Sequence, residues 1–415
     1  MTGVRWVAVV LALSAARTAS AQDSPGFRGA GRDGKLSGFK APATWPAELK
    51  QGWQVEVGQG HSTPALVEGR LYVHARQGEE EVVLCLDAAN GKELWRDRLA
   101  VPYEPPGAAK EYEKGPFSSP AVSGGRVYAF GISGVLSCLD AKSGKVVWRN
   151  DFKDSHPNPA PMWGTGLSPL VADGICVVHV GREKKGTLFA LDAADGKPRW
   201  KWEGDGPGYA SPVLARVGGR TQLITQTEVL AVGLDPADGK LLWKLPYATQ
   251  YEQNSVTPVI FGDLVILSGY KMGTTALKVD GAEPAKAWDT KDVSMYMSTA
   301  VLKGERLFGF SEKRSGQFFC LNAKSGETLW TDEDGKRGEN AAVLDAGSAV
   351  LALVTPAPRK AAEPSHLLVF EASDKEYVEK ARYKVADGPA FAHPVVSGSS
   401  IFIKGKTKLT QWTLP

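Results

Sequence analysis

The sequence predicts an all-β fold, an eight-bladed β-propeller of four-stranded antiparallel blades. The first observation is a phrase that returns along the chain, as in LCLDAANGKELWRD (84–97) and LSCLDAKSGKVVWRN (136–150). The second is that two independent markers of this repeat each occur eight times. The third is that no repeat contains ten residues with helical periodicity. Repeats spaced by about 40–55 residues are typical of propellers.

Each repeat presents its strand and turn signals in the same order. It opens with Ser-Pro or Thr-Pro and a short apolar run, as in SSPAV (118–122), and a glycine turn and a β-rich run follow, as in GGRVYAFG (124–131). A polar hairpin then leads to an apolar strand that ends in Leu-Asp-Ala. A turn with Gly-Lys precedes the last strand, which carries Trp. Alternating apolar residues between such turns predict four short strands.

The recurring phrase is interpreted as structural. In the copy at 136–150, Asp140 can accept hydrogen bonds from backbone N–H groups of the turn, and Gly144 can supply a positive φ. Trp148 is then expected to pack its ring between neighbouring sheets. We therefore assign no catalytic role to the Asp and Trp residues of the repeat.

The number of blades follows from the two markers and their order. The final unit stops before a fourth strand, whereas the aromatic strand GWQVEV (52–57) precedes the first opening. Circular closure explains both, because the N-terminal strand can complete the last blade and leave no long free edge. The strand-ending aromatics are Trp53, Trp95, Trp148, Trp200, Trp243, Trp288, Trp330 and Tyr383, and the openings are Pro64, Pro120, Pro169, Pro212, Pro258, Ala300, Ala342 and Pro394.

The chain is divided into three parts. Residues 1–21 have a basic start, an apolar run and an Ala-Ser-Ala end, which predicts a secretory signal peptide. Residues 22–49 are an N-terminal extension, and 50–415 form a single propeller. No cysteine lies near residue 21, so a lipid anchor is not expected. No later run of apolar residues is long enough to span a membrane. We expect an exported protein, periplasmic or extracellular, and a monomer.

Charge and cysteine content exclude some classes of function. The formal net charge is +3, and Arg5 and Arg17 within residues 1–21 account for two of these charges. The rest of the chain is nearly neutral, so nothing attracts nucleic acid. Three of the four cysteines occupy the same position of different repeats, where bridging is geometrically unfavourable. All four (Cys85, Cys138, Cys176 and Cys320) are expected to be buried and unpaired.

The repeats resemble those of the pyrroloquinoline quinone (PQQ) repeat family of eight-bladed propellers. The resemblance covers about 50–415 and rests on AxxGxxxW-like units, such as AKSGKVVW (141–148). It implies one of two kinds of protein, quinoprotein alcohol and glucose dehydrogenases or non-catalytic propellers such as the outer-membrane-assembly scaffold. The segment FRGAGRDG (27–34) is similar to a leader of secreted PQQ-like propellers. The chain is placed nearest the secreted non-catalytic members and the outer-membrane-assembly scaffold. The fold alone does not decide function.

Strand order predicts where a ligand would bind. The loops before the Ser/Thr-Pro openings and the hairpins between second and third strands share one face, around the channel mouth. An aromatic floor with a basic rim would suit an anionic or planar ligand. The alternative is that the basic hairpins only confer solubility. The candidate ligand-binding residues are His61, Arg76, Trp163, Arg182, Tyr251, Gln253, Asn254, Lys271, Tyr296, Asn340 and His393.

No catalytic or metal-binding residue is predicted. A PQQ dehydrogenase would need several carboxylates around Ca²⁺, but the mouth loops offer only Glu252, Asp292 and Glu339, one to a blade. The histidines have no metal-binding spacing, and no GxSxG motif occurs.

Three hypotheses for function result from these observations. The first is an exported, non-catalytic scaffold that binds a protein, a peptide or a small anionic ligand at the mouth, with no cofactor. The alternative is a PQQ-dependent oxidoreductase with a minimal PQQ and calcium site. A third, a carbohydrate-binding module, draws on the mouth aromatics Trp163, Tyr251 and Tyr296.

Overall fold

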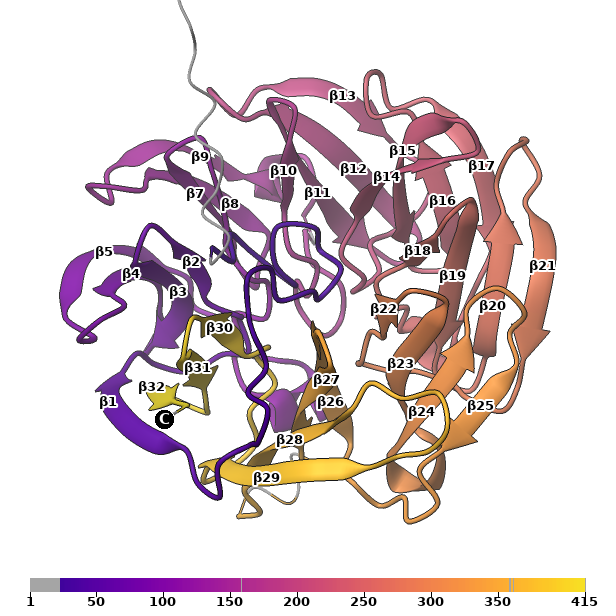
Figure 1. Cartoon of the computed structure of the whole chain (residues 1–415). Helices are drawn as coiled ribbons and strands as arrows, with labels where there is room; N and C mark the ends of the chain where they lie inside the picture. The colour runs from indigo at the N-terminus through magenta and orange to yellow at the C-terminus, as the bar shows by residue number, and fades with distance from the viewer. Residues whose placement is uncertain (1–22, 158, 358–359, 361, 415) are drawn as a thin grey trace, which may run out of the picture.

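A computed structural model describes residues 23–157, 159–357, 360 and 362–414. Eight four-stranded antiparallel sheets are arranged in a ring around a central channel (Figure 1). The predicted eight-bladed propeller is confirmed. The predicted signal peptide, residues 1–21, lies outside the described residues.

The blades follow one another along the chain, each running from an inner to an outer strand. Strands of the first four blades are β2 (Ala65–Val67), β3 (Arg70–Gln77), β4 (Glu80–Asp87) and β5 (Glu93–Ala100); β6 (Ala121–Ser123), β7 (Arg126–Phe130), β8 (Val135–Asp140) and β9 (Val146–Asp151); β10 (Leu170–Ala172), β11 (Ile175–Arg182), β12 (Lys185–Asp192) and β13 (Pro198–Trp202); β14 (Val213–Val217), β15 (Arg220–Gln226), β16 (Leu230–Leu234) and β17 (Leu241–Pro246).

The remaining four blades repeat this order, and the last one takes its outer strand from the N-terminal part of the chain. Their strands are β18 (Val259–Phe261), β19 (Leu264–Gly269), β20 (Gly273–Lys278) and β21 (Ala285–Thr290); β22 (Val301–Lys303), β23 (Arg306–Ser311), β24 (Gln317–Asn322) and β25 (Thr328–Thr331); β26 (Asn340–Ala346), β27 (Ala349–Thr355), β28 (Ser365–Glu371) and β29 (Glu379–Ala386); β30 (Val395–Ser397), β31 (Ser400–Lys404), β32 (Lys408–Thr413) and β1 (Lys50–Glu56).

Helical structure among the described residues is confined to short 3₁₀ turns in loops. These are η1 (Gly107–Tyr112), η2 (Phe152–Asp154), η3 (Gln250–Glu252) and η4 (Lys313–Ser315). None of the helices in the described part of the chain has the length and apolarity needed to cross a membrane.

The ring is closed as the sequence predicted. Strand β1 pairs antiparallel with β32, and Val55 lies opposite Leu409 in this ladder. The outer edge of the last blade is thus supplied by a segment more than 350 residues away in sequence. Closure removes the free edge that an open array of sheets would expose.

Neighbouring blades are joined by the tryptophan of the recurring phrase. The Trp95 indole Nε1 donates to the Ala141 carbonyl of the next blade at 3.1 Å. Its ring lies over Gly144, where a Cβ atom would come within 2.5 Å of it. Gly144 has φ of 73°, and the Asp140 carboxylate accepts from the Ser143 N–H at 2.8 Å. The same indole bond joins Trp53 to Ala88, Trp148 to Ala193, Trp200 to Pro236, Trp288 to Ala323 and Trp330 to Ser373.

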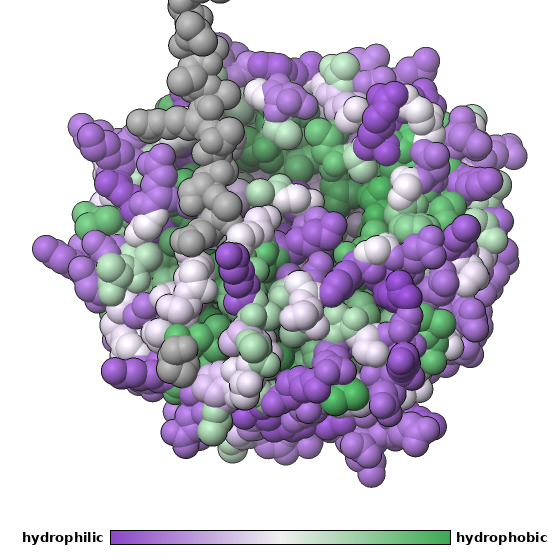
Figure 2. All heavy atoms as spheres, viewed as in Figure 1, coloured by the Kyte–Doolittle hydropathy of each residue, from purple (hydrophilic) through white to green (hydrophobic). Residues whose placement is uncertain are grey.

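The core lies between successive sheets, where the middle strands are almost wholly buried. All four cysteines are buried there and free, as expected. On the face seen in Figure 2, hydrophilic residues dominate the rim, and hydrophobic residues show towards the centre of the ring.

The N-terminal segment crosses the central channel (Figure 1). We call residues 23–36 the plug. It pairs with Leu66 through Ser24 and with Asp345 through Lys35, so it links two blades on different sides of the ring. Two buried arginines fix its middle.

Each plug arginine donates to the two carbonyls that immediately precede an inner strand. The Arg28 guanidinium donates to the carbonyls of Thr299 at 2.9 Å and Ala300 at 2.7 Å. Arg32 donates to the carbonyls of Pro169 at 2.8 Å and Ser168 at 3.0 Å. Because these strands belong to the third and sixth blades, the plug spans the channel.

Candidate functional site

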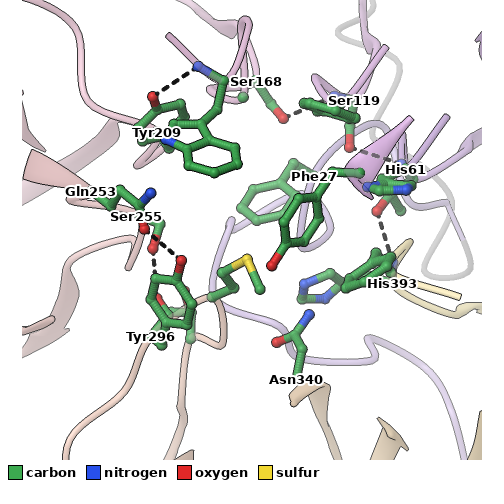
Figure 3. Close-up of a pocket in the computed structure, with 18 residues that line it drawn as sticks. Phe27, His61, Ser119, Ser168, Tyr209, Gln253, Ser255, Tyr296, Asn340 and His393 are labelled. Carbon is green, nitrogen blue, oxygen red and sulfur yellow. Dashed lines mark hydrogen bonds between the residues drawn. The ribbon is translucent and has the colours of Figure 1, made fainter. Parts of the chain in front are cut away.

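A cavity of about 230 Å³ lies on the propeller axis at the loop-rich mouth. Every one of the eight blades contributes to it, through the loop before its inner strand or, in the seventh blade, through the first residue of β26. The plug supplies one further residue, Phe27. Its lining residues, drawn in Figure 3, are Phe27, His61, Thr63, Tyr112, Phe117, Ser119, Trp163, Gly166, Ser168, Tyr209, Gln253, Ser255, Tyr296, Met297, Thr299, Asn340, Phe391 and His393.

Aromatic rings form one side of the cavity. The His61 ring packs between Phe117, with a centroid distance of 4.9 Å, and Phe391, at 4.4 Å. Tyr112 meets Trp163 edge-on at 5.8 Å. This wall joins loops before the first, second, third and eighth blades, so it depends on ring closure.

Phe27 forms the floor. Its ring meets His393 edge-on, with centroids 5.1 Å apart, and Figure 3 shows it among the lining side chains. The neighbouring Arg28 holds this part of the plug on the sixth blade. The deepest surface of the cavity is therefore built by the N-terminal extension.

The cavity carries no ionised lining group near neutral pH. None of its lining residues is Lys, Arg, Asp or Glu. Burial lowers the pKa of His61 to about 3, helped by the nearby Lys404 and Lys406. Burial also lowers the pKa of His393 to about 3, with a further contribution from Arg28. Both imidazoles are neutral at physiological pH.

The two carboxamides of the cavity are held in defined orientations. The Tyr296 hydroxyl donates to Gln253 Oε1, and the Ser298 hydroxyl donates to Asn340 Oδ1. Ser298 Oγ already accepts from the Ala341 N–H at 3.0 Å, which leaves its proton for Asn340. The NH₂ groups of Gln253 and Asn340 consequently have no partner among the described residues, and that of Asn340 points towards the other labelled residues in Figure 3.

The Ser and Thr residues before the openings link adjacent blades around the channel. The Thr63 N–H donates to Ser119 Oγ and the Ser119 N–H to Ser168 Oγ, both at 3.0 Å. The His393 N–H donates to Thr63 Oγ1 at 2.9 Å, which joins the eighth blade to the first. The Thr257 N–H donates to Thr299 Oγ1 at 3.1 Å.

These hydroxyl groups can still form hydrogen bonds with a ligand. Each accepts a backbone N–H and retains a proton and a second lone pair. Within the described part of the chain, none of the four hydroxyl protons of Thr63, Ser119, Ser168 and Thr299 has an acceptor, and all four side chains are buried. The Ser and Thr residues before the openings thus build a polar array that lines the cavity.

The structure brings together six of the eleven candidate residues, namely His61, Trp163, Gln253, Tyr296, Asn340 and His393. Asn254 is buried behind the wall and donates to the carbonyls of Thr227 and Tyr247. Tyr251 is 72% exposed and outside the cavity.

None of the three basic candidates lines the cavity. Arg76 is only 2% exposed, where it donates to the Val101 and Lys114 carbonyls and pairs with Glu81. Arg182 pairs with Glu183 at 2.7 Å. The Lys271 ammonium lies over the Tyr270 ring at 4.9 Å.

Sequence reasoning missed Phe27 and the hydroxyl array. The aromatic residue at the head of FRGAGRDG and the repeated Ser/Thr before Pro were visible signals, but their convergence depends on the closed ring.

The residues present do not fit PQQ with calcium. PQQ carries three carboxylates, and Ca²⁺ needs six to eight oxygen ligands, several from carboxylates. The three candidate carboxylates lie outside the cavity lining. Glu252 pairs with Lys184 at 3.0 Å, Asp292 accepts from Thr328, and Glu339 accepts from Tyr112 at 3.2 Å. No group of three His, Cys, Asp or Glu residues suited to a metal occurs within the described ranges.

The fold and repeats define the class, a PQQ-type eight-bladed propeller with a cavity at its mouth. Residues 43–110 and 79–332 match the protein family described as outer membrane protein assembly factor BamB, and the chain belongs to this family.

Curated relatives fall into two groups. The BamB protein of Yersinia pestis is 24% identical over 68% of this chain and 70% of that protein. The polyvinylalcohol dehydrogenase of a Pseudomonas species is 24% identical over 60% of this chain and 50% of its own length. The quinohemoprotein alcohol dehydrogenase ADH-IIG of Pseudomonas putida is 27% identical over 37% of this chain, but the match spans only 21% of that enzyme.

Solved structures show the same fold. BamB from Moraxella catarrhalis superposes with a TM-score of 0.64 at 16% identity, covering 88% of this chain and 99% of that one. The quinohemoprotein alcohol dehydrogenase of Comamonas testosteroni gives 0.69 at 14% identity, covering 95% and 81%. Proteins named as an assembly factor and as alcohol dehydrogenases share this architecture, so the fold alone does not distinguish the two.

Proposed function

We propose that the protein is an exported, non-catalytic binding propeller that holds a protein, peptide or small-molecule ligand in its mouth cavity. Export rests on the signal-peptide pattern of residues 1–21. Partner binding rests on membership of the BamB family, whose name describes an assembly factor.

One observation supports binding over catalysis. The cavity joins aromatic walls to neutral hydrogen-bonding groups and has no carboxylate or cationic side chain in its lining. A hydride or proton transfer site of the quinoprotein type would need a positioned base and oxygen ligands for calcium. A ligand site needs only an apolar concave surface with a few fixed polar groups, and this cavity has both.

The similarity to alcohol dehydrogenases keeps a PQQ-dependent oxidoreductase as the alternative. That alternative would require PQQ to bind without lining cations to balance its carboxylates. Burying unpaired charge is costly, so the neutral lining favours the binding role.

A comparative ligand screen tests the proposal. Thermal unfolding of the wild type, Trp163→Ala and Tyr251→Ala would be followed with a library of metabolites, glycosides and short peptides. Trp163 lines the cavity, whereas Tyr251 is an exposed aromatic on a neighbouring loop, so it is the matched control. We expect ligands that stabilise the wild type and Tyr251→Ala but not Trp163→Ala. Ligands that stabilise all three proteins equally would contradict a site at the mouth.

A further inference from the structure

We propose that the mouth cavity binds a neutral sugar ring, such as the terminal residue of a glycan. This inference rests on the proposed binding function and names the chemical class of its ligand. It follows from the size of the cavity, from the absence of charged side chains in its lining, and from the hydrogen-bond donors of the lining that have no acceptor among the described residues.

The cavity has room for one substituted six-membered ring. Its volume is about 230 Å³, whereas a cavity of about 150 Å³ is enough for benzene. A pyranose with its hydroxyl groups is larger than benzene, and the difference in volume leaves space for those groups. The opening at the mouth would leave the rest of a glycan in solvent.

Charged ligands are poorly matched to this lining. The positive groups near the cavity histidines are committed to the protein. Lys404 donates to the carbonyls of Gly58 and Gly60, Arg28 donates to those of Thr299 and Ala300, and Lys406 pairs with Glu113 at 3.0 Å. On the other side, Glu339 accepts from the Tyr112 hydroxyl. An ion in the cavity would lose hydration without gaining a counter-ion in direct contact.

A purely apolar group is also poorly matched. It would cover the hydroxyls of Thr63, Ser119, Ser168 and Thr299 and the NH₂ groups of Gln253 and Asn340 without pairing their protons. Buried donors left unpaired disfavour binding. A sugar hydroxyl can both donate and accept a hydrogen bond, as the Ser and Thr hydroxyls can. The hydroxyls of a sugar ring would therefore accept the protons of these protein groups.

The aromatic residues suit a saturated ring better than a flat base. A planar base binds best in a slot between parallel rings, but the one stacked contact among the described lining rings, Phe117 on His61, is already closed. Other contacts among the described lining rings are edge-on or tilted, including Tyr112 on Trp163 and Phe27 on His393. Single ring faces remain, onto which the C–H face of a pyranose can pack.

Calorimetric titration with matched neutral and charged sugars tests the inference. The probes are methyl glucoside, methyl galactoside and N-acetylglucosamine, with methyl glucuronide, methyl galacturonide and glucosamine as their charged counterparts. We expect at least one neutral sugar to bind, and its charged counterpart to bind about tenfold more weakly or not at all. Trp163→Ala and Gln253→Ala should each weaken binding about tenfold, and Tyr251→Ala should not.

Two results would overturn the inference, and each differs from failure of the proposed function. Equal or tighter binding of the charged sugars would refute the argument from the neutral lining. If no sugar bound while indole, phenol, adenosine or a short peptide bound in a Trp163-dependent manner, the mouth would be a binding site for another class. Only the absence of every mouth-dependent ligand would reject the proposed function itself.

Discussion

Lys404 allows a quantitative prediction about the loop that carries His61. Lys404 is only 1% exposed. Its ammonium donates to the carbonyls of Gly58 at 3.1 Å and of Gly60 at 2.6 Å, immediately before His61. Burial lowers the pKa of Lys404 from 10.5 to about 8, against the raising effect of Glu113 and Glu56. The folded protein therefore releases this proton at lower pH than the unfolded chain does.

The sign of the pH dependence follows from this difference. Between the folded pKa of about 8 and the unfolded pKa of 10.5, the unfolded state binds more protons, so the contribution of Lys404 to stability rises with pH. Each pH unit in this range is worth about 1.4 kcal/mol. From pH 7.5 to 9.5 we expect a gain of about 2 kcal/mol from this residue, because the lysine is still partly protonated at the lower end.

Urea unfolding of the wild type and Lys404→Met across this range measures the effect. The four buried thiols have raised pKa values, with desolvation as the first cause, and they lower stability with increasing pH in both proteins. Their effect cancels in the difference between the two free energies of unfolding. That difference should change by about 2 kcal/mol in favour of the wild type as the pH rises. A difference that stays constant from pH 7.5 to 9.5 would refute the reasoning about the buried ammonium.

Two further predictions concern packing between blades and the cavity floor. In urea unfolding, Gly144→Ala should destabilise the protein by about 2 kcal/mol more than Gly69→Ala. Both glycines have φ of 73°, but only Gly144 lies under a Trp ring. Equal losses of stability in the two variants would contradict the packing role of Trp95. Phe27→Ala should expose the His393 ring and raise the pKa of His393 from about 3 towards 6.5. NMR titration of the His393 ring measures this pKa. An unchanged pKa of His393 would show that Phe27 does not close the floor of the cavity.

The fold could be predicted from sequence because its determinants recur locally. Trp95 and Gly144 belong to adjacent copies of one phrase, and the same spacing reproduces the same indole contact around most of the ring. Closure of the ring could also be predicted, because the chain has one extra strand at Trp53 and lacks a strand after Trp412, and these two strand positions complete one blade.

The candidate site was less predictable because side-chain direction depends on details that loops do not repeat. Tyr251 has φ of 68° within η3 and is turned out to solvent, whereas Gln253 two residues later reaches the cavity. Arg76 lies opposite Glu81 in the β3–β4 ladder, and its side chain pairs with Glu81 in a buried position rather than at the rim. Phe27 reaches the cavity only because the plug crosses the channel, a long-range arrangement that no local pattern encodes.

The most direct test of the central claim is a calorimetric titration of the purified protein with PQQ, in the presence and absence of Ca²⁺. A binding propeller whose mouth lacks carboxylates and cations in its lining should show no calcium-dependent heat of binding. Micromolar or tighter binding of PQQ that requires Ca²⁺ would contradict the account and identify the protein as a quinoprotein.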